Sequence, residues 1–217
     1  MQCCVYCGDE EPTQRDHVPP RCLFKKPRPD DLITVPSCGE CNQGASEDDE
    51  YLRLVLSMQH DVFEHPDAEK AWEKAFRSLR RPQAKGLRKE TLDSIRTVGV
   101  RTESGLYVEK AGVIDVDLSR LESVVERTME GLYYHHRDQR LPDDLEVSAF
   151  ALDGLPNDDL EIAERFVEFY QFVVGADLHS IGDDVFTYRM RFIEDNPNAG
   201  VFFCTFYEAV SFMGFFA

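Results

Sequence analysis

Two pairs of cysteines near the start of the chain constrain its fold more than any other feature. Each pair has the spacing Cys-x2-Cys, Cys4 with Cys7 and Cys38 with Cys41, and thirty residues lie between the pairs. A two-residue gap lets the backbone fold back so that both sulfurs reach one ion, and four thiolates make a typical tetrahedral zinc site. We therefore predict that these four cysteines bind a structural zinc ion that staples the N-terminal segment.

The other cysteines fit this interpretation. The chain has 7 cysteines, an odd number, and six of them lie in the first 41 residues, whereas a disulfide scaffold would spread them along a secreted chain. Cys3 could replace Cys4 as a ligand, although the spacing favours Cys4, and Cys22 is expected to be a small core residue rather than a fifth ligand. No signal-peptide pattern and no apolar run of ~18 residues is present. We expect a cytoplasmic protein with no membrane partner.

Periodicity divides the chain into a small module and a larger body. Prolines forbid a long helix before residue 36, and residues 32–35 are β-prone. The expected class is α+β, with a zinc-stapled module over residues 1–60 and an α+β body with antiparallel strands over residues 65–217. Its aromatic C-terminal strands are expected to form sheet core, and a protein partner of this body is the alternative. Helical patterns cover residues 41–60, 67–79, 118–139 and 158–172, a hairpin pattern covers 94–108, and strand patterns cover 145–152, 185–193, 201–207 and 210–216.

Charge is distributed unevenly along the chain. With 24 basic and 41 acidic side chains the net charge is -17, so the protein as a whole should repel phosphate backbones. Residues 70–101 are the exception, with 10 basic and 3 acidic side chains. A phosphate-binding surface and an ordinary solvated helix face are equally good interpretations of this segment. The candidate nucleic-acid contacts are Lys70, Lys74, Arg77, Arg80 and Arg81.

A short polar motif between the cysteine pairs provides the candidate chemistry. Asp16 and His17 precede two prolines, and Asn42 follows the last cysteine of the second pair. A zinc-stapled strand–strand–helix unit would bring these residues together. Asp16 and Asn42 would then offer two oxygens to a hard cation such as Mg²⁺, and an unliganded His17, with a pKa near ~6.5, could accept a proton from water.

These motifs together resemble the HNH endonuclease family over about residues 3–58. The resemblance rests on Cys4-x2-Cys7, Asp16-His17-Val18-Pro19-Pro20, Asp31-Leu32-Ile33-Thr34 and Cys38-x2-Cys41-Asn42. It implies a ββα-metal, treble-clef-like module that hydrolyses phosphodiester bonds, most commonly in DNA and in a restriction or phage-defence setting. By this resemblance His17 is the general base, Asp16 and Asn42 hold catalytic Mg²⁺ or Mn²⁺, and Asp31 steadies His17.

Two positions depart from the family pattern. Asp31 stands where the family has an asparagine, and a carboxylate there is expected to raise the basicity of His17. Ala45 stands where many members have a lysine, which removes a possible phosphate contact. The alternative function is therefore a non-catalytic zinc module that binds nucleic acid or protein.

Overall fold

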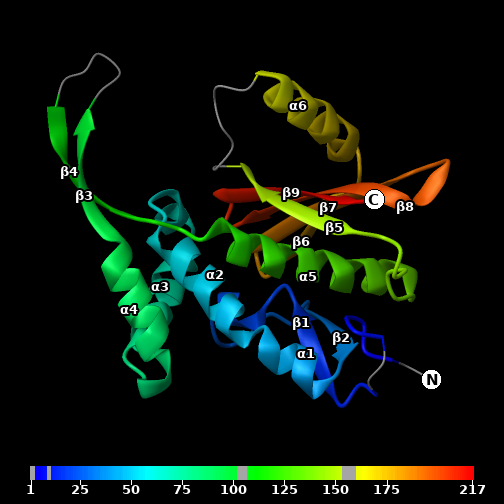
Figure 1. Ribbon diagram of the computed structural model, residues 1–217, viewed down its shortest axis with the longest axis horizontal. Coiled ribbons are helices and arrows are strands. Elements are labelled where there is room, and N and C mark those ends of the chain that lie inside the picture. The colour runs from blue at the N-terminus through cyan, green and yellow to red at the C-terminus, as the bar shows by residue number, and fades with distance from the viewer. Residues whose placement is uncertain (1–2, 9–10, 102–106, 153–159) are drawn as a thin grey trace.

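A β-hairpin followed by a helix forms the N-terminal part of the computed structural model, which describes residues 3–8, 11–101, 107–152 and 160–217. Strand β1 (Gln14–Val18) pairs antiparallel with β2 (Ile33–Ser37), and α1 (Gly39–Gly44) follows directly (Figure 1). The predicted order of two strands and a helix is confirmed. Strand β2 continues through Pro36, which pairs with Arg15, because a two-stranded sheet has edge positions where a missing N–H is tolerated.

Three α-helices and a hairpin follow this unit in the described residues and connect it to the rest of the chain. The helical pattern over residues 41–60 forms two helices, because the chain breaks at Ala45 between α1 and α2. The predicted helix at 67–79 is confirmed as α3, and the hairpin predicted at 94–108 is confirmed, although residues 102–106 lie outside the described residues. The elements are α2 (Ser46–Met58), α3 (Ala68–Leu79), α4 (Lys85–Ser94), β3 (Ile95–Arg101), β4 (Tyr107–Ile114) and the short turns η1 (Arg21–Leu23), η2 (Asp61–Glu64) and η3 (Pro82–Ala84).

The C-terminal body is a sheet with a helix on each face (Figure 1). The sheet has the strand order β5-β9-β8-β7-β6, and every strand pairing in the described residues is antiparallel, so the predicted α+β class is confirmed. The strand expected at residues 201–207 begins earlier, since β8 already starts at Asn196. The elements are α5 (Leu118–Arg137), β5 (Val147–Ala151), α6 (Leu160–Val174), β6 (His179–Ile181), β7 (Phe186–Ile193), β8 (Asn196–Phe206) and β9 (Val210–Phe216).

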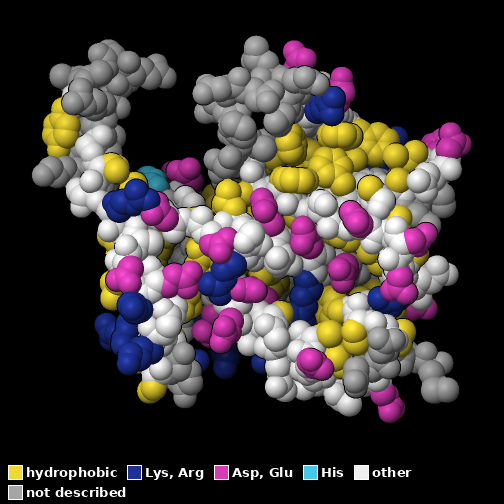
Figure 2. Space-filling model, viewed as in Figure 1, with side chains coloured by type: hydrophobic (Ala, Val, Ile, Leu, Met, Phe, Trp, Pro, Cys, Tyr) yellow, Lys and Arg dark blue, Asp and Glu magenta, His cyan; other side chains and the backbone are white. Residues whose placement is uncertain are grey.

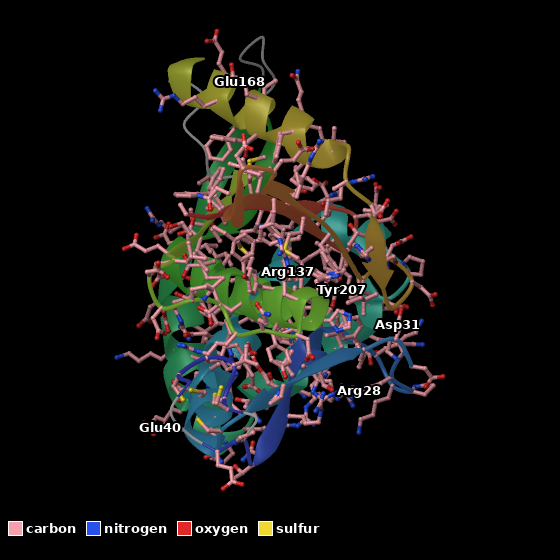
Figure 3. The ribbon with its side chains drawn as sticks, turned by 90° about the vertical axis from the view of Figure 1, so that its right-hand side faces the viewer. Arg28, Asp31, Glu40, Arg137, Glu168 and Tyr207 are labelled. Carbon is pink, nitrogen blue, oxygen red and sulfur yellow. The ribbon has the colours of Figure 1, made fainter. Side chains whose placement is uncertain are left out.

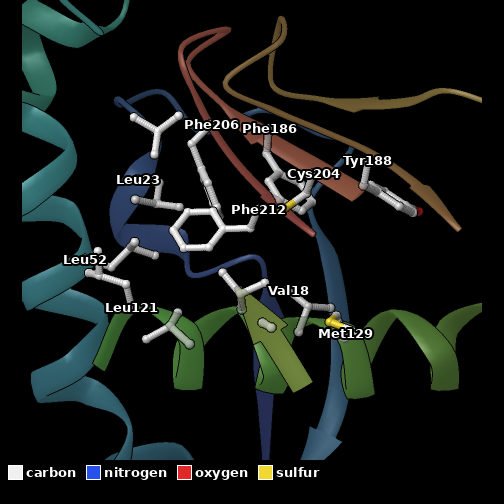
Figure 4. Packing of buried hydrophobic residues seen from close by; sticks show 14 of the residues in the cluster. Val18, Leu23, Leu52, Leu121, Met129, Phe186, Tyr188, Cys204, Phe206 and Phe212 are labelled. Atoms are coloured by element: carbon white, nitrogen blue, oxygen red, sulfur yellow. The ribbon is translucent and has the colours of Figure 1, made fainter. Parts of the chain in front are cut away.

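Helix α5 joins the two parts into one hydrophobic core (Figure 4). It contacts β1, β2 and α2 on one side and β5 and β9 on the other. Val18 of β1, Leu52 of α2, Met129 of α5 and Phe212 of β9 belong to one cluster and are at most 2% exposed. The boundary between residues 60 and 65 therefore does not separate two cores. The aromatic C-terminal strand contributes to this core, since Phe216 is also buried.

Candidate functional site

The four paired cysteines meet at one point beside the hairpin. The Sγ atoms of Cys4, Cys7, Cys38 and Cys41 all lie within 4.8 Å of one another, and those of Cys7 and Cys38 are 4.0 Å apart. Zinc–sulfur bonds of ~2.3 Å in a tetrahedron place sulfurs about 3.8 Å apart, so the group can close around one ion. The cluster is consistent with the predicted structural zinc. It contains Cys4 rather than Cys3.

Backbone geometry around the cluster is that of two tight metal knuckles. Gly8 has φ +77°, a conformation that favours glycine, and its N–H donates to the carbonyl of Cys4 at 3.0 Å. In the second knuckle the N–H of Cys41 donates to Sγ of Cys38 at 3.3 Å as α1 begins. Figure 3 labels Glu40 on α1, next to the sulfur atoms. Both knuckles therefore present their sulfurs to the same point.

The thiols of the cluster influence one another's ionisation. Burial raises the pKa of Cys4, but backbone hydrogen bonds at Cys38, Cys7 and Tyr6 outweigh it and lower that pKa to about 6. Burial raises the pKa of Cys41, and the neighbouring Cys38 and Cys4 raise it further. Cys4 loses its proton readily, whereas the neighbouring cysteines oppose the deprotonation of Cys41. A dication at the centre would remove this opposition, because zinc binds cysteine as the thiolate.

A cavity of about 950 Å³ lies between β1, α1, α2 and α4. Asp16 and His17 of β1 and Asn42 of α1 all line it. These are the residues that the sequence predicted to meet, and they reach the cavity because the hairpin folds back onto α1.

Comparisons with protein-family models, curated proteins and solved structures give no match to this chain.

Asp16 has a cationic partner that sequence reasoning missed. Its Oδ2 accepts hydrogen bonds from Oη of Tyr6 at 2.7 Å and from Nη2 of Arg127 at 2.6 Å, and its Oδ1 accepts the backbone N–H of His17 at 2.9 Å. The Asp16 and Arg127 side chains are 13% and 16% exposed. Arg127 also lies 4.4 Å from the centre of the Tyr6 ring. No local signal marks Arg127, which comes from α5, 111 residues along the chain.

His17 is partly buried beside positive charge. Burial lowers its pKa, Arg21 and Arg28 lower it further, and Asp16 opposes them. The carboxylate that raises this pKa is Asp16 rather than the expected Asp31, and its effect is smaller than that of burial or of Arg21. A neutral imidazole at pH 7 is free to accept a proton.

Asp31 lies away from this cavity. Its Oδ2 accepts the N–H of Gly182 at 3.1 Å, so the carboxylate binds the turn between β6 and β7 (Figure 3). It lines a second cavity, of about 660 Å³, with His179 and Tyr188. The predicted role of Asp31 in steadying His17 is corrected accordingly. The cause is that the loop before β2 packs on the C-terminal sheet, which the N-terminal sequence does not reveal.

Asn42 fits the chemistry of a hard-cation ligand. Its Nδ2 donates to Oε1 of Gln14 at 2.5 Å, which leaves its own Oδ1 as an acceptor. Among the described residues, the four cysteines are the only group of three or more His, Cys, Asp or Glu side chains close enough to share one ion. A second cation at Asp16 and Asn42 would therefore be completed by water and substrate, as is usual for Mg²⁺.

Asp49, in the first turn of α2, is a further cavity residue that the sequence did not single out. Burial raises its pKa to about 7, Arg127 opposes this, and the nearby Asp16 adds to it. The burial of Asp49 follows from the packing of α5 over α2.

The basic segment is only partly on the cavity. Nζ of Lys74 donates to the carbonyl of Cys22 at 2.8 Å, and burial lowers the pKa of Lys74 to about 8. Arg77 lies 3.9 Å from Glu73, and of the five predicted contacts only Arg81 lines the cavity. Figure 2 shows Lys and Arg gathered over α4, where Lys85, Arg88 and Lys89 are exposed and do not line the cavity.

Within the described ranges, no helix is long and apolar enough to cross a bilayer.

Proposed function

We propose that this chain is a metal-dependent phosphodiesterase of the HNH endonuclease type, with DNA as its preferred substrate. One observation carries the proposal. Asp16, His17 and Asn42, which are spread over 27 residues of sequence, line a single cavity next to the cysteine cluster. The cluster would hold structural zinc and fix the hairpin against α1. A reducing compartment such as the cytoplasm suits seven free cysteines.

His17 is the proposed general base. Its lowered pKa keeps the ring neutral at pH 7, so it can take a proton from the water that attacks phosphorus. Asp16 and Oδ1 of Asn42 would hold Mg²⁺ or Mn²⁺. When bound, such an ion supplies positive charge to the phosphate and the leaving oxygen. The backbone N–H of His17 donates to Oδ1 of Asp16, which holds this carboxylate against β1.

Arg127 and Tyr6 set the position of the Asp16 carboxylate. Both donate to Oδ2, whereas Oδ1 has one donor and retains a lone pair. Arg127 also offsets the charge of this partly buried acid before substrate arrives. It is therefore a positioning residue in this proposal, and it competes with any cation that approaches Oδ2.

Plasmid nicking with Mg²⁺ or Mn²⁺ tests the proposal. We expect the wild type to nick DNA, and His17→Ala to lose nicking at least 100-fold while keeping its zinc content and circular dichroism spectrum. Asp31→Asn is the matched control, since Asp31 faces the other cavity, and we expect it to keep near-wild-type activity. Single-stranded DNA and RNA serve as parallel substrates. Equal activity of His17→Ala and wild type would exclude His17 as the base.

The same contacts support a second candidate, a zinc module that binds without cleaving. The Asp16 carboxylate already has Arg127 as its cation, and Ala45 removes a possible phosphate contact. This candidate predicts nucleic-acid or protein binding with no cleavage of any substrate under any metal condition. The nicking assay therefore separates the two candidates.

A further inference from the structure

Four arginines line the cavity that contains His17, and they differ in their partners. Arg120 pairs with Asp48 at 2.6 Å and Glu90 at 3.4 Å. Arg15 donates to the hydroxyl and the carbonyl of Thr34 at 2.8 and 2.7 Å. Within the described part of the chain, the side chains of Arg21 and Arg81 form no ion pair and no hydrogen bond, and both are exposed. Two cations of the cavity are thus available to an anion.

The two free arginines come from different parts of the chain. Arg21 begins η1, directly after β1 and the proline pair, and Arg28 donates to its carbonyl at 2.6 Å, which ties this turn in place. Arg81 lies between α3 and η3, on the side of the cavity formed by α4. Arg21 is close enough to His17 to influence its charge. Arg21, Arg81 and His17 thus line one cavity.

We infer that Arg21 and Arg81 form the phosphate-binding pair of this cavity and hold a phosphodiester of a nucleic acid beside His17. This inference rests on the proposed function. Guanidinium groups match phosphate through paired N–H donors, and they keep their charge at all physiological pH values. In a chain of net charge -17, two unpaired guanidiniums that line one cavity provide the local attraction that the whole molecule lacks.

The exposed cations of α4 offer a matched comparison. Lys85, Arg88 and Lys89 belong to the same basic segment, whereas the α4 residues that line the cavity are Gly86, Leu87 and Glu90. If phosphate is held in the cavity, removing two charges from the outer surface of α4 should change the affinity for nucleic acid little. If the affinity follows overall charge alone, removing two charges from α4 and removing those of Arg21 and Arg81 should weaken binding equally.

Fluorescence anisotropy with a labelled 20-base-pair DNA duplex tests the inference in the His17→Ala background, where the probe is not consumed. We expect Arg21→Gln and Arg81→Gln each to weaken binding about tenfold. The double variant should also lower the slope of log K against log salt by about 2. Arg88→Gln with Lys89→Gln is the control, and we expect less than a threefold effect. Single-stranded DNA and RNA of the same sequence show which form the pair prefers.

The outcomes separate the inference from the proposed function. If the parent binds duplex and the Arg21/Arg81 double variant loses no more affinity than the control, the inference is wrong and the proposed function stands. If the parent binds none of the three probes, both are wrong. If binding depends on the pair but the wild type cleaves nothing, the inference stands for a binding protein and the proposed catalysis fails.

Discussion

At the scale of single residues, the contact between Asp16 and Arg127 joins the candidate site to the body of the protein. A carboxylate that is 13% exposed needs a partner, and the only cation bonded to it in the described residues comes from α5. Removing one member of such a pair leaves a poorly solvated charge. The resulting loss of folding free energy is larger than the stabilisation that the intact pair contributes.

We therefore expect Arg127→Met, which keeps an unbranched apolar stem, to lower the free energy of unfolding by about 3 kcal/mol. Urea denaturation of the wild type, Arg127→Met, Asp16→Asn and the double variant would measure this. The double variant should recover part of the loss, since it leaves no unpaired carboxylate. Strictly additive losses would show that the two side chains do not interact.

Asp49 gives a stability prediction with a defined sign. Its pKa is raised from the ordinary 3.8 to about 7 by burial, so the folded state keeps a proton that the unfolded state has lost over this range. Its contribution to stability therefore falls as the pH rises from about 4 to about 7. Asp49→Asn should match the wild-type Tm near pH 4 and exceed it by several degrees at pH 8. A difference that is independent of pH would contradict this assignment.

At the scale of elements, close packing of α5 against β1 positions the site. A Cβ on Gly131 would lie 2.4 Å from Cγ1 of Val18, which is next to His17 in β1. Gly131→Ala should therefore lower stability by about 1–3 kcal/mol, because a filled core has no room for the methyl group. Val18→Ala in the same chain should restore part of the loss. Gly44→Ala is the control in thermal unfolding, since a Cβ there meets nothing within 4 Å.

Elements with strong periodicity could be predicted from the sequence. The apolar stripe of α5, with Leu121, Val125, Met129 and Leu132 buried, predicts a helix over nearly its whole length. Helix α4 was missed because its sequence is mostly charged and only Thr91 is clearly buried. The break at Ala45 was missed because α1 has no buried residue, so no apolar pattern marks where it ends.

The candidate site was predictable where it depends on spacing and unpredictable where it depends on packing. The cysteine spacing indicated the cluster, and the polar motif indicated Asp16, His17 and Asn42, which line one cavity. Arg127 approaches through the packing of α5 on the hairpin, and Asp31 is drawn away by its bond to Gly182. Both contacts join residues more than 100 positions apart, which a local pattern does not encode.

At the scale of the whole molecule, the cysteine cluster and the body share one core. Val5, which lies between Cys4 and Tyr6, belongs to the same buried cluster as Phe212 and Phe216. Removing zinc should therefore destabilise the complete molecule rather than one module. We expect a strong chelator, or Cys38→Ser, to lower a single calorimetric Tm by about 10 °C or more. An unchanged Tm of the main transition would show that the body folds independently of the cluster.

The central claim is that the cysteine-stapled unit assembles a hydrolytic centre around His17. The most direct test of this claim compares the rates of plasmid nicking by the wild type and His17→Ala. Each protein is loaded with one zinc per chain, and Mn²⁺ is supplied at increasing concentration. The account predicts a metal-dependent rate for the wild type and none above background for the variant. Equal rates for the two proteins, or no cleavage by the wild type at any Mn²⁺ concentration, would contradict it.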